Sequence, residues 1–362
     1  MKRLLPAAIL ASFMLAGSGL VVLSNQPGQP RNVVARSASA VAPIEVDDDL
    51  VPPHLEPSPP PSPSPSPKPA PPKPSPKPKS QSPAKPTGDL VAYQGLGAWV
   101  DVYDYALRDN LDPSAAVDEM ARHGVKTLFL QTGRYKEPAD IVNSQKVDLF
   151  LEKAHAKGIK VVGWYLPGFG DLERDLRRSL LVLSYSTPTG HRFDGFAPDI
   201  ESREEVGNDR LRFNAGIIEY SRRLRAAVPP GTVIGAIVVD AKNNERAPAR
   251  WEGFPWPEIA IHYDVVLSMA YWSVTKKDCM TQYDVAAYMR DVIAKTEALM
   301  GSRKPVHPIG GIADCISGGE TSAFVTALKQ AGAIGGSLYD FQTTEKNPES
   351  EGIWAELGRL NQ

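Results

Sequence analysis

The stretch FDGFAPDIES, residues 193–202, indicates where the functional part of this chain lies. It has the pattern of a short apolar strand that ends in two acids, Asp199 and Glu201. Side chains two residues apart in a strand point to the same face, which here also carries the small residues Gly195 and Ala197. The residues between them would face covering helices. The stretch therefore predicts small residues followed by acids along the wall of a cavity.

Two carboxylates on the inner face of a buried strand are costly to leave unpaired, because charge is poorly solvated away from water. Such a pair is typical of a chemical site, where acids with perturbed pKa values gather. The alternative is a structural ion pair, either with the nearby Arg203 or with an arginine from another strand. Both interpretations stay open at this point.

Composition excludes several classes of protein. The 362 residues carry a formal net charge of −2, so the chain lacks a basic footprint and we expect no nucleic-acid partner. The six histidines are scattered and the two cysteines fit no zinc spacing, which disfavours a metal-dependent hydrolase. We therefore expect neither a metal nor a cofactor.

The first residues have the features of an export segment. Lys2 and Arg3 precede an apolar run that extends from Leu4 to Leu23. We assign residues 1–25 to a signal peptide or membrane anchor, and we expect the remainder to be exported, extracellular or associated with the cell surface or cell wall. About 20 apolar residues can span a bilayer, and the small-residue site at 38–40 lies well beyond the run. This favours an uncleaved anchor in the membrane.

Residues 26–87 are rich in proline, serine and lysine, and half of the chain's 34 prolines fall between Pro52 and Pro86. Such a sequence adopts polyproline II rather than a packed core. At about 3.1 Å per residue, the proline-rich part reaches on the order of 100 Å. We interpret the segment as a disordered stalk that holds a domain away from a membrane. The alternative is a ligand for proline-reading domains.

From residue 88 to residue 362, apolar strand-like runs alternate with amphipathic helical segments. Eight such units, whose strands look buried on both faces, predict a (β/α)8 barrel. A doubly wound open sheet is the alternative, but no Gly-x-Gly-x-x-Gly turn follows the first strand. The predicted strands are 97–105, 126–132, 159–167, 195–202, 232–240, 264–272, 306–314 and 333–342.

In such a barrel the active site lies at the C-terminal ends of the strands. Carboxylates among aromatic rings suit sugars, and glycoside cleavage needs one protonated acid and a second group that stabilises positive charge. We predict Glu201 as the general acid with a raised pKa, and Asp199 as the ionised charge stabiliser. The predicted substrate-binding residues are Asp101, Tyr103, Gln131, Trp164, Tyr165, Asp240, Tyr271, Trp272 and Asp340.

These residues resemble a pattern of the family 18 glycoside hydrolases, the chitinase-like (β/α)8 enzymes. That family carries D-G-x-D-x-D-x-E at the end of strand four, and Asp194, Gly195, Asp199 and Glu201 match it in register. The resemblance implies that Glu201 is the general acid and that Asp199 positions an N-acetyl group of the substrate.

Two further patches are similar to the same family. Met269 and Tyr271 resemble its Met-x-Tyr on strand six, and Gly335-Gly336 resembles the Gly-Gly that begins strand eight. The resemblance implies that Tyr271 is a partner of the N-acetyl group.

Three positions depart from the family pattern. The middle aspartate is replaced by Ala197, Trp272 stands where the family has an acid or amide, and Asp340 takes the place of the strand-eight tryptophan. The change at residue 197 removes the neighbour that would share a proton with Asp199. Asp340 is in turn a candidate second carboxylate facing Glu201.

We expect an exported glycoside hydrolase, acting as a monomer on an extracellular or cell-envelope carbohydrate polymer. The alternative is a non-catalytic glycan-binding barrel tethered at the cell surface, which Ala197 and Trp272 favour.

Two smaller features carry their own predictions. Cys279 and Cys315 fall in loops after strands six and seven, and in an oxidising compartment we predict a disulfide between them. The aromatic loop at 251–257 is either a sugar platform or, as is more common, packing under a long loop.

Overall fold

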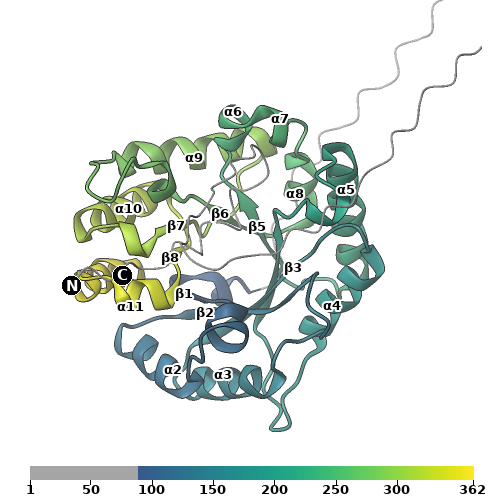
Figure 1. Cartoon of the computed structure of the whole chain (residues 1–362), viewed down its shortest axis with the longest axis horizontal. Helices are drawn as coiled ribbons and strands as arrows, with labels where there is room; N and C mark the ends of the chain where they lie inside the picture. Colours follow the sequence, from purple (N-terminus) through teal and green to yellow (C-terminus); the bar gives the residue numbers. More distant parts are fainter. Residues whose placement is uncertain (1–88) are drawn as a thin grey trace, which may run out of the picture. The chain divides into compact units, whose positions relative to one another are not determined.

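The computed structural model describes residues 89–362, and the predicted export segment and stalk lie outside this part. Eight parallel strands close into a barrel in chain order, β1 to β8, and helices surround them (Figure 1). The (β/α)8 barrel predicted from the sequence is therefore confirmed. Its strands are β1 Gly95–Val100, β2 Thr127–Arg134, β3 Lys160–Leu166, β4 Gly195–Ile200, β5 Gly235–Val239, β6 Val265–Met269, β7 Ile309–Ile312 and β8 Gly335–Tyr339.

The helices on the outside follow the strands in alternation (Figure 1). Several begin at an acidic N-cap; Asp112, for example, accepts a hydrogen bond from the backbone N–H of Ala115. No helix of residues 89–362 has the length and apolar character needed to cross a bilayer. The helices are α2 Pro113–Arg122, α3 Ser144–Ala156, α4 Leu172–Ser184, α5 Arg210–Ala227, α6 Asn243–Arg246, α7 Pro248–Trp251, α8 Trp256–His262, α9 Val285–Met300, α10 Gly318–Ala331, α11 Phe341–Lys346 and α12 Ser350–Gly358.

Several predicted strands are shorter in the structure than the sequence pattern suggested, and aspartates explain two of these corrections. The first strand stops at Val100 because the Asp101 carboxylate accepts the backbone N–H groups of Tyr103 and Asp104, which starts a helical turn. The eighth stops at Tyr339 because Asp340 becomes the N-cap of α11. Both aspartates therefore remain at the C-terminal ends of their strands.

The interior of the barrel is filled by large side chains. Trp99 stacks on Phe129 with ring centroids 4.3 Å apart, and the imidazole of His307 packs edge-on against Phe129 at 4.9 Å. A Cβ at Gly97 would lie 2.7 Å from the Phe129 ring, so only glycine fits there. Tyr93, just before β1, accepts hydrogen bonds at its hydroxyl from the backbone N–H groups of residues 196 and 235. These contacts close the barrel beneath the strand ends.

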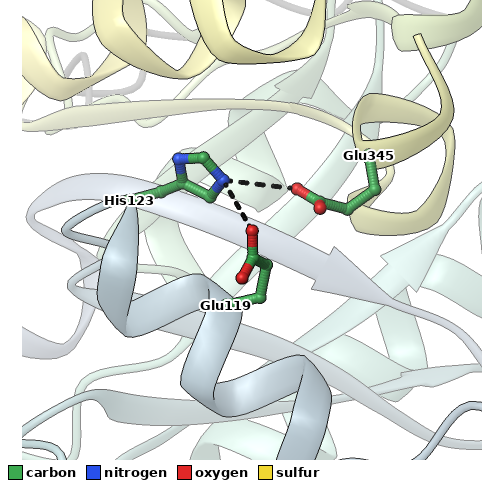
Figure 2. A group of neighbouring side chains, drawn as sticks. All are labelled: Glu119, His123 and Glu345. Carbon is green, nitrogen blue, oxygen red and sulfur yellow. Dashed lines mark ion pairs between the residues drawn. The ribbon is translucent and has the colours of Figure 1, made fainter.

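A cluster of side chains at the surface connects the outer helices α2, α11 and α12. Figure 2 shows the imidazole of His123 directed at two glutamates, with Nε2 3.3 Å from Glu119 and 3.5 Å from Glu345. The ring also stacks on Trp354, and the guanidinium of Arg122 contacts both Glu119 and His123 Nε2. Burial, aided by the positive charge of Arg122, lowers the pKa of His123. The arginine supplies the positive charge, so we interpret this cluster as structural.

The predicted disulfide between Cys279 and Cys315 is present and links the loops that follow β6 and β7. Lys276 supports it, since its buried ammonium group donates to the carbonyl oxygens of both cysteines at 3.1 Å. The same ammonium group also forms an ion pair with Glu320 of α10. The loops on this side of the barrel are thus held by one covalent and several polar links.

Replacing both cysteines by serine should destabilise the barrel without changing its fold. The bridge spans 36 residues, for which the chain-entropy model gives about 4 kcal/mol. We expect a corresponding fall in the free energy of unfolding in urea, with unchanged circular dichroism. Equal stability of the wild-type and double-serine proteins under non-reducing conditions would contradict this contribution.

Candidate active site

The two acids at the end of β4 lie where the sequence placed them. They are directed into the mouth of the barrel, by which we mean the opening at the C-terminal ends of the strands. Asp199 is the last but one residue of β4 and only 6 % exposed, whereas Glu201 follows the strand and is partly exposed. Ala197 and Gly235 approach each other on the same inner face, because a Cβ at Gly235 would lie 3.2 Å from that of Ala197. The small residues make room for the acids above them.

Neither acid is held by an arginine or lysine of residues 89–362. The Asp199 Oδ1 atom is buried and has no hydrogen-bond partner in this part of the chain. Arg203, the partner that an ion pair would have required, donates instead to the carbonyl oxygen of Arg250 at 2.6 Å. The structural ion pair is therefore not the explanation of this pair of carboxyls.

Burial changes the protonation of the pair. It raises the pKa of Glu201 to about 7, against a smaller opposing effect of the positive charge of Arg250. Burial, and then the negative charge of Glu201, raise the pKa of Asp199 well above its ordinary value. Both pKa values are raised, so the pair retains protons towards neutral pH. The sequence interpretation, with the proton on Glu201 and the charge on Asp199, stays a prediction.

Tyr271 lies among the acids of the mouth. Its pKa is raised by burial and by the negative charges of Glu201, Asp199, Asp340 and Asp101, in that order. Its ring lies 5.8 Å from that of Tyr339. Tyr271 therefore lies close both to the acids at the end of β4 and to those at the ends of β1 and β8.

A second acidic group faces the β4 pair from the ends of β1 and β8. Carboxylate oxygens of Asp101, Asp104 and Asp340 lie within 4.8 Å of one another. Burial and the neighbouring acids raise the pKa of Asp104 to about 9 and that of Asp340 to about 6. The oxygens already accept hydrogen bonds, among them one from the Tyr339 hydroxyl to Asp101 at 2.8 Å. The spacing would suit a small cation, but the retained protons let this group persist without one.

The residues predicted to bind substrate divide into two sets. Those that the structure places at the mouth include Trp164, which is 4 % exposed and whose indole Nε1 has no partner within residues 89–362. Gln131 lies beside β1, where its amide oxygen accepts the N–H of Val102 at 3.0 Å. Tyr103 lies at the rim beneath the guanidinium of Arg134. This set comprises Asp101, Tyr103, Gln131, Trp164, Tyr271 and Asp340.

Three predicted residues point away from the mouth and are corrected here. The hydroxyl of Tyr165 donates to Asp175 of α4 at 2.7 Å. Asp240 is held by Arg246 and by the hydroxyl of Tyr288 on α9.

Trp272 is the third correction. It is fully buried, with its ring centroid 5.2 Å from that of Phe324 on α10. All three residues belong to the packing between barrel and helices. The loop aromatics Trp251, Phe254 and Trp256 are also buried and pack on one another, which confirms the packing interpretation of that loop.

Comparison with solved structures confirms the resemblance to barrel glycoside hydrolases at the level of the fold. A chitinase from Bacteroides thetaiotaomicron aligns over 74% of this chain and 96% of its own, with 10% identity and a TM-score of 0.52. A family GH18 chitinase from Cycas revoluta in complex with allosamidin aligns over 74% and 99%, with 12% identity and a TM-score of 0.53.

Other barrel glycosidases are similar to the same extent. The endo-1,4-beta-D-mannanase of Thermotoga petrophila RKU-1 aligns over 68% of this chain and 88% of its own, with 14% identity and a TM-score of 0.51. No protein-family model and no curated protein matches the sequence. The chain thus shares the barrel of several glycoside hydrolases while differing from them in most residues.

Asp199→Asn should stabilise the protein at alkaline pH. A carboxyl whose folded pKa lies above its unfolded pKa destabilises the fold once it is charged, and this cost is removed as pH falls. The asparagine variant should therefore have a Tm a few degrees above wild type at pH 8, since 1 kcal/mol corresponds to roughly 2–4 °C in a domain of this size. The difference should vanish towards pH 4. A lower Tm for the variant at pH 8 would indicate that Asp199 is an ion-paired structural residue.

Proposed function

We propose that this protein is a glycoside hydrolase that acts on an extracellular or cell-envelope polysaccharide, with Glu201 as its general acid. The observation that carries the proposal is the pair Asp199 and Glu201 at the C-terminal end of β4, which forms no ion pair within residues 89–362 and of which Asp199 is almost fully buried. Keeping such a pair has a cost in stability, which chemistry at the site explains. The ring of Tyr271 beside the acids offers a surface for a sugar ring, and the indole N–H of Trp164, opposite Ala197 on the adjacent strand β3, is a donor without a partner in residues 89–362.

Proton transfer from Glu201 is the first step. With a pKa of about 7, a large share of Glu201 is protonated at neutral pH, which suits donation to the glycosidic oxygen as the bond to the sugar breaks. A water molecule then bonds to the anomeric carbon of the cleaved sugar and gives a proton to Glu201, which restores the acid. Because the two carboxyl groups are coupled, the state with the proton on Glu201 leaves Asp199 ionised, as the charge stabiliser that the sequence suggested.

Negative charge from the opposite wall supports the same step. Asp340, with a pKa of about 6, is largely ionised at neutral pH and faces the developing positive charge of the sugar together with Asp199. The alanine at 197 leaves Asp199 without the third acid of the family 18 pattern, so Asp340 and its neighbours take the place of that acid.

The setting of the enzyme remains a prediction from the sequence. The export or anchor segment at residues 1–25 and the proline-rich stalk at 26–87 would present the barrel outside the cell, near a wall polymer. The disulfide between Cys279 and Cys315 supports an oxidising location. Carbohydrate is the partner that the site favours, because (GlcNAc)4 and allosamidin occupy the similar chitinases from Cycas revoluta.

A glycan-binding barrel without catalysis is the second candidate. Ala197 favours it, because a site with fewer acids has fewer routes for a proton. Both candidates predict binding of an oligosaccharide at the mouth, and they differ in whether new reducing ends appear.

Glu201→Gln should abolish hydrolysis of whichever polysaccharide the wild-type protein cleaves. The panel is chitin oligosaccharides, β-1,4-mannan and isolated bacterial wall glycans, with reducing ends measured over time. Loss of the general acid should lower the rate about 10²- to 10⁴-fold while leaving Tm at neutral pH equal or higher. Asp314→Asn is the matched control, since this exposed carboxyl follows β7 but stands apart from the acid pair.

Two results would overturn the assignment. Undiminished turnover by the glutamine variant would remove Glu201 from the reaction. Binding of glycans by the wild-type protein with no reducing ends from any member of the panel would instead favour the non-catalytic barrel.

A further inference from the structure

Two arginines lie together on one side of the mouth, next to Glu201. Arg203 follows β4 and is 8 % exposed, and Arg250 belongs to α7 in the loop after β5. Their guanidinium carbons lie 5.8 Å and 5.2 Å from the ring centre of Trp251. Arg250 is close enough for its charge to act on Glu201.

The hydrogen-bonding capacity of this arginine pair is largely unused. The Nε atoms of both residues are buried and have no partner within residues 89–362. Arg203 makes one bond, to the carbonyl oxygen of Arg250. Neither guanidinium forms an ion pair in this part of the chain, and the charge of Arg250 adds to burial in lowering the pKa of Arg203. Two like charges are thus held together without an ion-paired carboxylate, and the acid on which the charge of Arg250 acts is Glu201, the proposed general acid.

Other arginines around the mouth are neutralised by the protein itself. Arg134 pairs with Glu137, Arg174 with Glu205 and Arg210 with Glu252. The contrast shows that this rim usually supplies a carboxylate for each guanidinium. The arginine pair at residues 203 and 250 is the exception among these.

Stacking on Trp251 accounts for part of this arrangement but not all of it. A structural role explains why Arg203 donates to the loop at Arg250. It leaves unexplained the Arg250 side chain, which has an unpartnered buried Nε and stands beside a catalytic acid. A guanidinium presents a planar fork of donors that matches a carboxylate or a phosphate, and an anion from a ligand would complete it.

We infer that Arg203 and Arg250 form a subsite for an anionic group on the glycan, so that the substrate is an acidic polysaccharide. The group is a carboxylate or phosphate carried by the sugar next to the cleaved bond. A uronic acid, the lactyl ether of a muramic acid residue or a polyol phosphate polymer each supplies this chemistry. The inference rests on the proposed function for the identity of the mouth as a glycan site.

Binding to the full-length protein tests the subsite directly. The probes are oligogalacturonate, peptidoglycan glycan strands and glycerol phosphate polymer, each titrated by calorimetry at about 50 mM and 500 mM salt. Carboxyl-reduced oligogalacturonate and carboxyl-reduced glycan strands are the matched neutral probes. The wild-type protein should bind at least one anionic probe at least 10-fold more tightly than the matched neutral probe. For the phosphate polymer, the neutral reference is chitin tetrasaccharide. High salt should weaken the preference for the anionic probe, because it screens charge.

Arg250→Gln should abolish the preference for the anionic probe and leave affinity for the neutral probe unchanged. Arg250 is chosen because its carbonyl, rather than its side chain, anchors Arg203. Arg212→Gln is the control, since it removes an equal charge from an exposed residue at the start of α5. Arg203→Lys, which keeps the charge but loses the planar fork, should weaken anion binding as well.

The results that would overturn the anion subsite differ from those that would overturn the proposed hydrolase function. Equal affinity of the wild-type protein for anionic and neutral probes, or equal effects of Arg250→Gln and Arg212→Gln, would overturn the subsite. Because the readout is binding, a preference for the anionic probe without hydrolysis would support the subsite and count against the hydrolase.

Discussion

The placement of two carboxyl groups at the end of β4 without an ion-pair partner in the described chain is the constraint on which the site depends. Asp199 is almost fully enclosed and its Oδ1 atom has no partner in the described chain. Because no arginine neutralises it, the pair must retain protons, and the pKa of Glu201 rises to about 7. The raised pKa values of these acids are therefore a consequence of where β4 ends and of which side chains surround its end.

The same principle operates on the opposite wall. Asp104 and Asp340 crowd together at the ends of β1 and β8, and burial raises the pKa of each. Hydrogen bonds from backbone N–H groups and from Tyr339 hold the neighbouring Asp101 in place. The mouth thus has one group of acids at the end of β4 and another at the ends of β1 and β8, with Tyr271 near both. Arg203 and Arg250 form its basic side.

Much of this site could be predicted from the sequence, because side chains at the C-terminal ends of the strands of a barrel lie together. Asp199, Glu201, Trp164 and Tyr271 follow from that rule alone. Tyr165 failed because it is adjacent in the chain to Trp164, which faces the mouth, and successive residues of a strand face opposite ways. Strict use of this alternation would have removed Tyr165. Trp272 failed for another reason, because β6 ends at Met269 and Trp272 lies in the turn after it, where its ring packs on Phe324.

Other features had no sequence signal. Asp240 directly follows β5 and looked like a free acid, but a buried tyrosine from the distant helix α9 and Arg246 hold it. Arg250 lies in a loop without periodicity, so nothing in the pattern connects it with Glu201. The raised pKa of Asp199 likewise depends on its depth in the folded barrel, which spacing alone does not give.

Tyr93 and the stacked rings of Trp99 and Phe129 leave no passage along the axis of the barrel. A long molecule therefore cannot thread through and must approach, bind and depart on a single side. Any ligand of the proposed site would therefore enter and leave through the end of the barrel at which the strands stop.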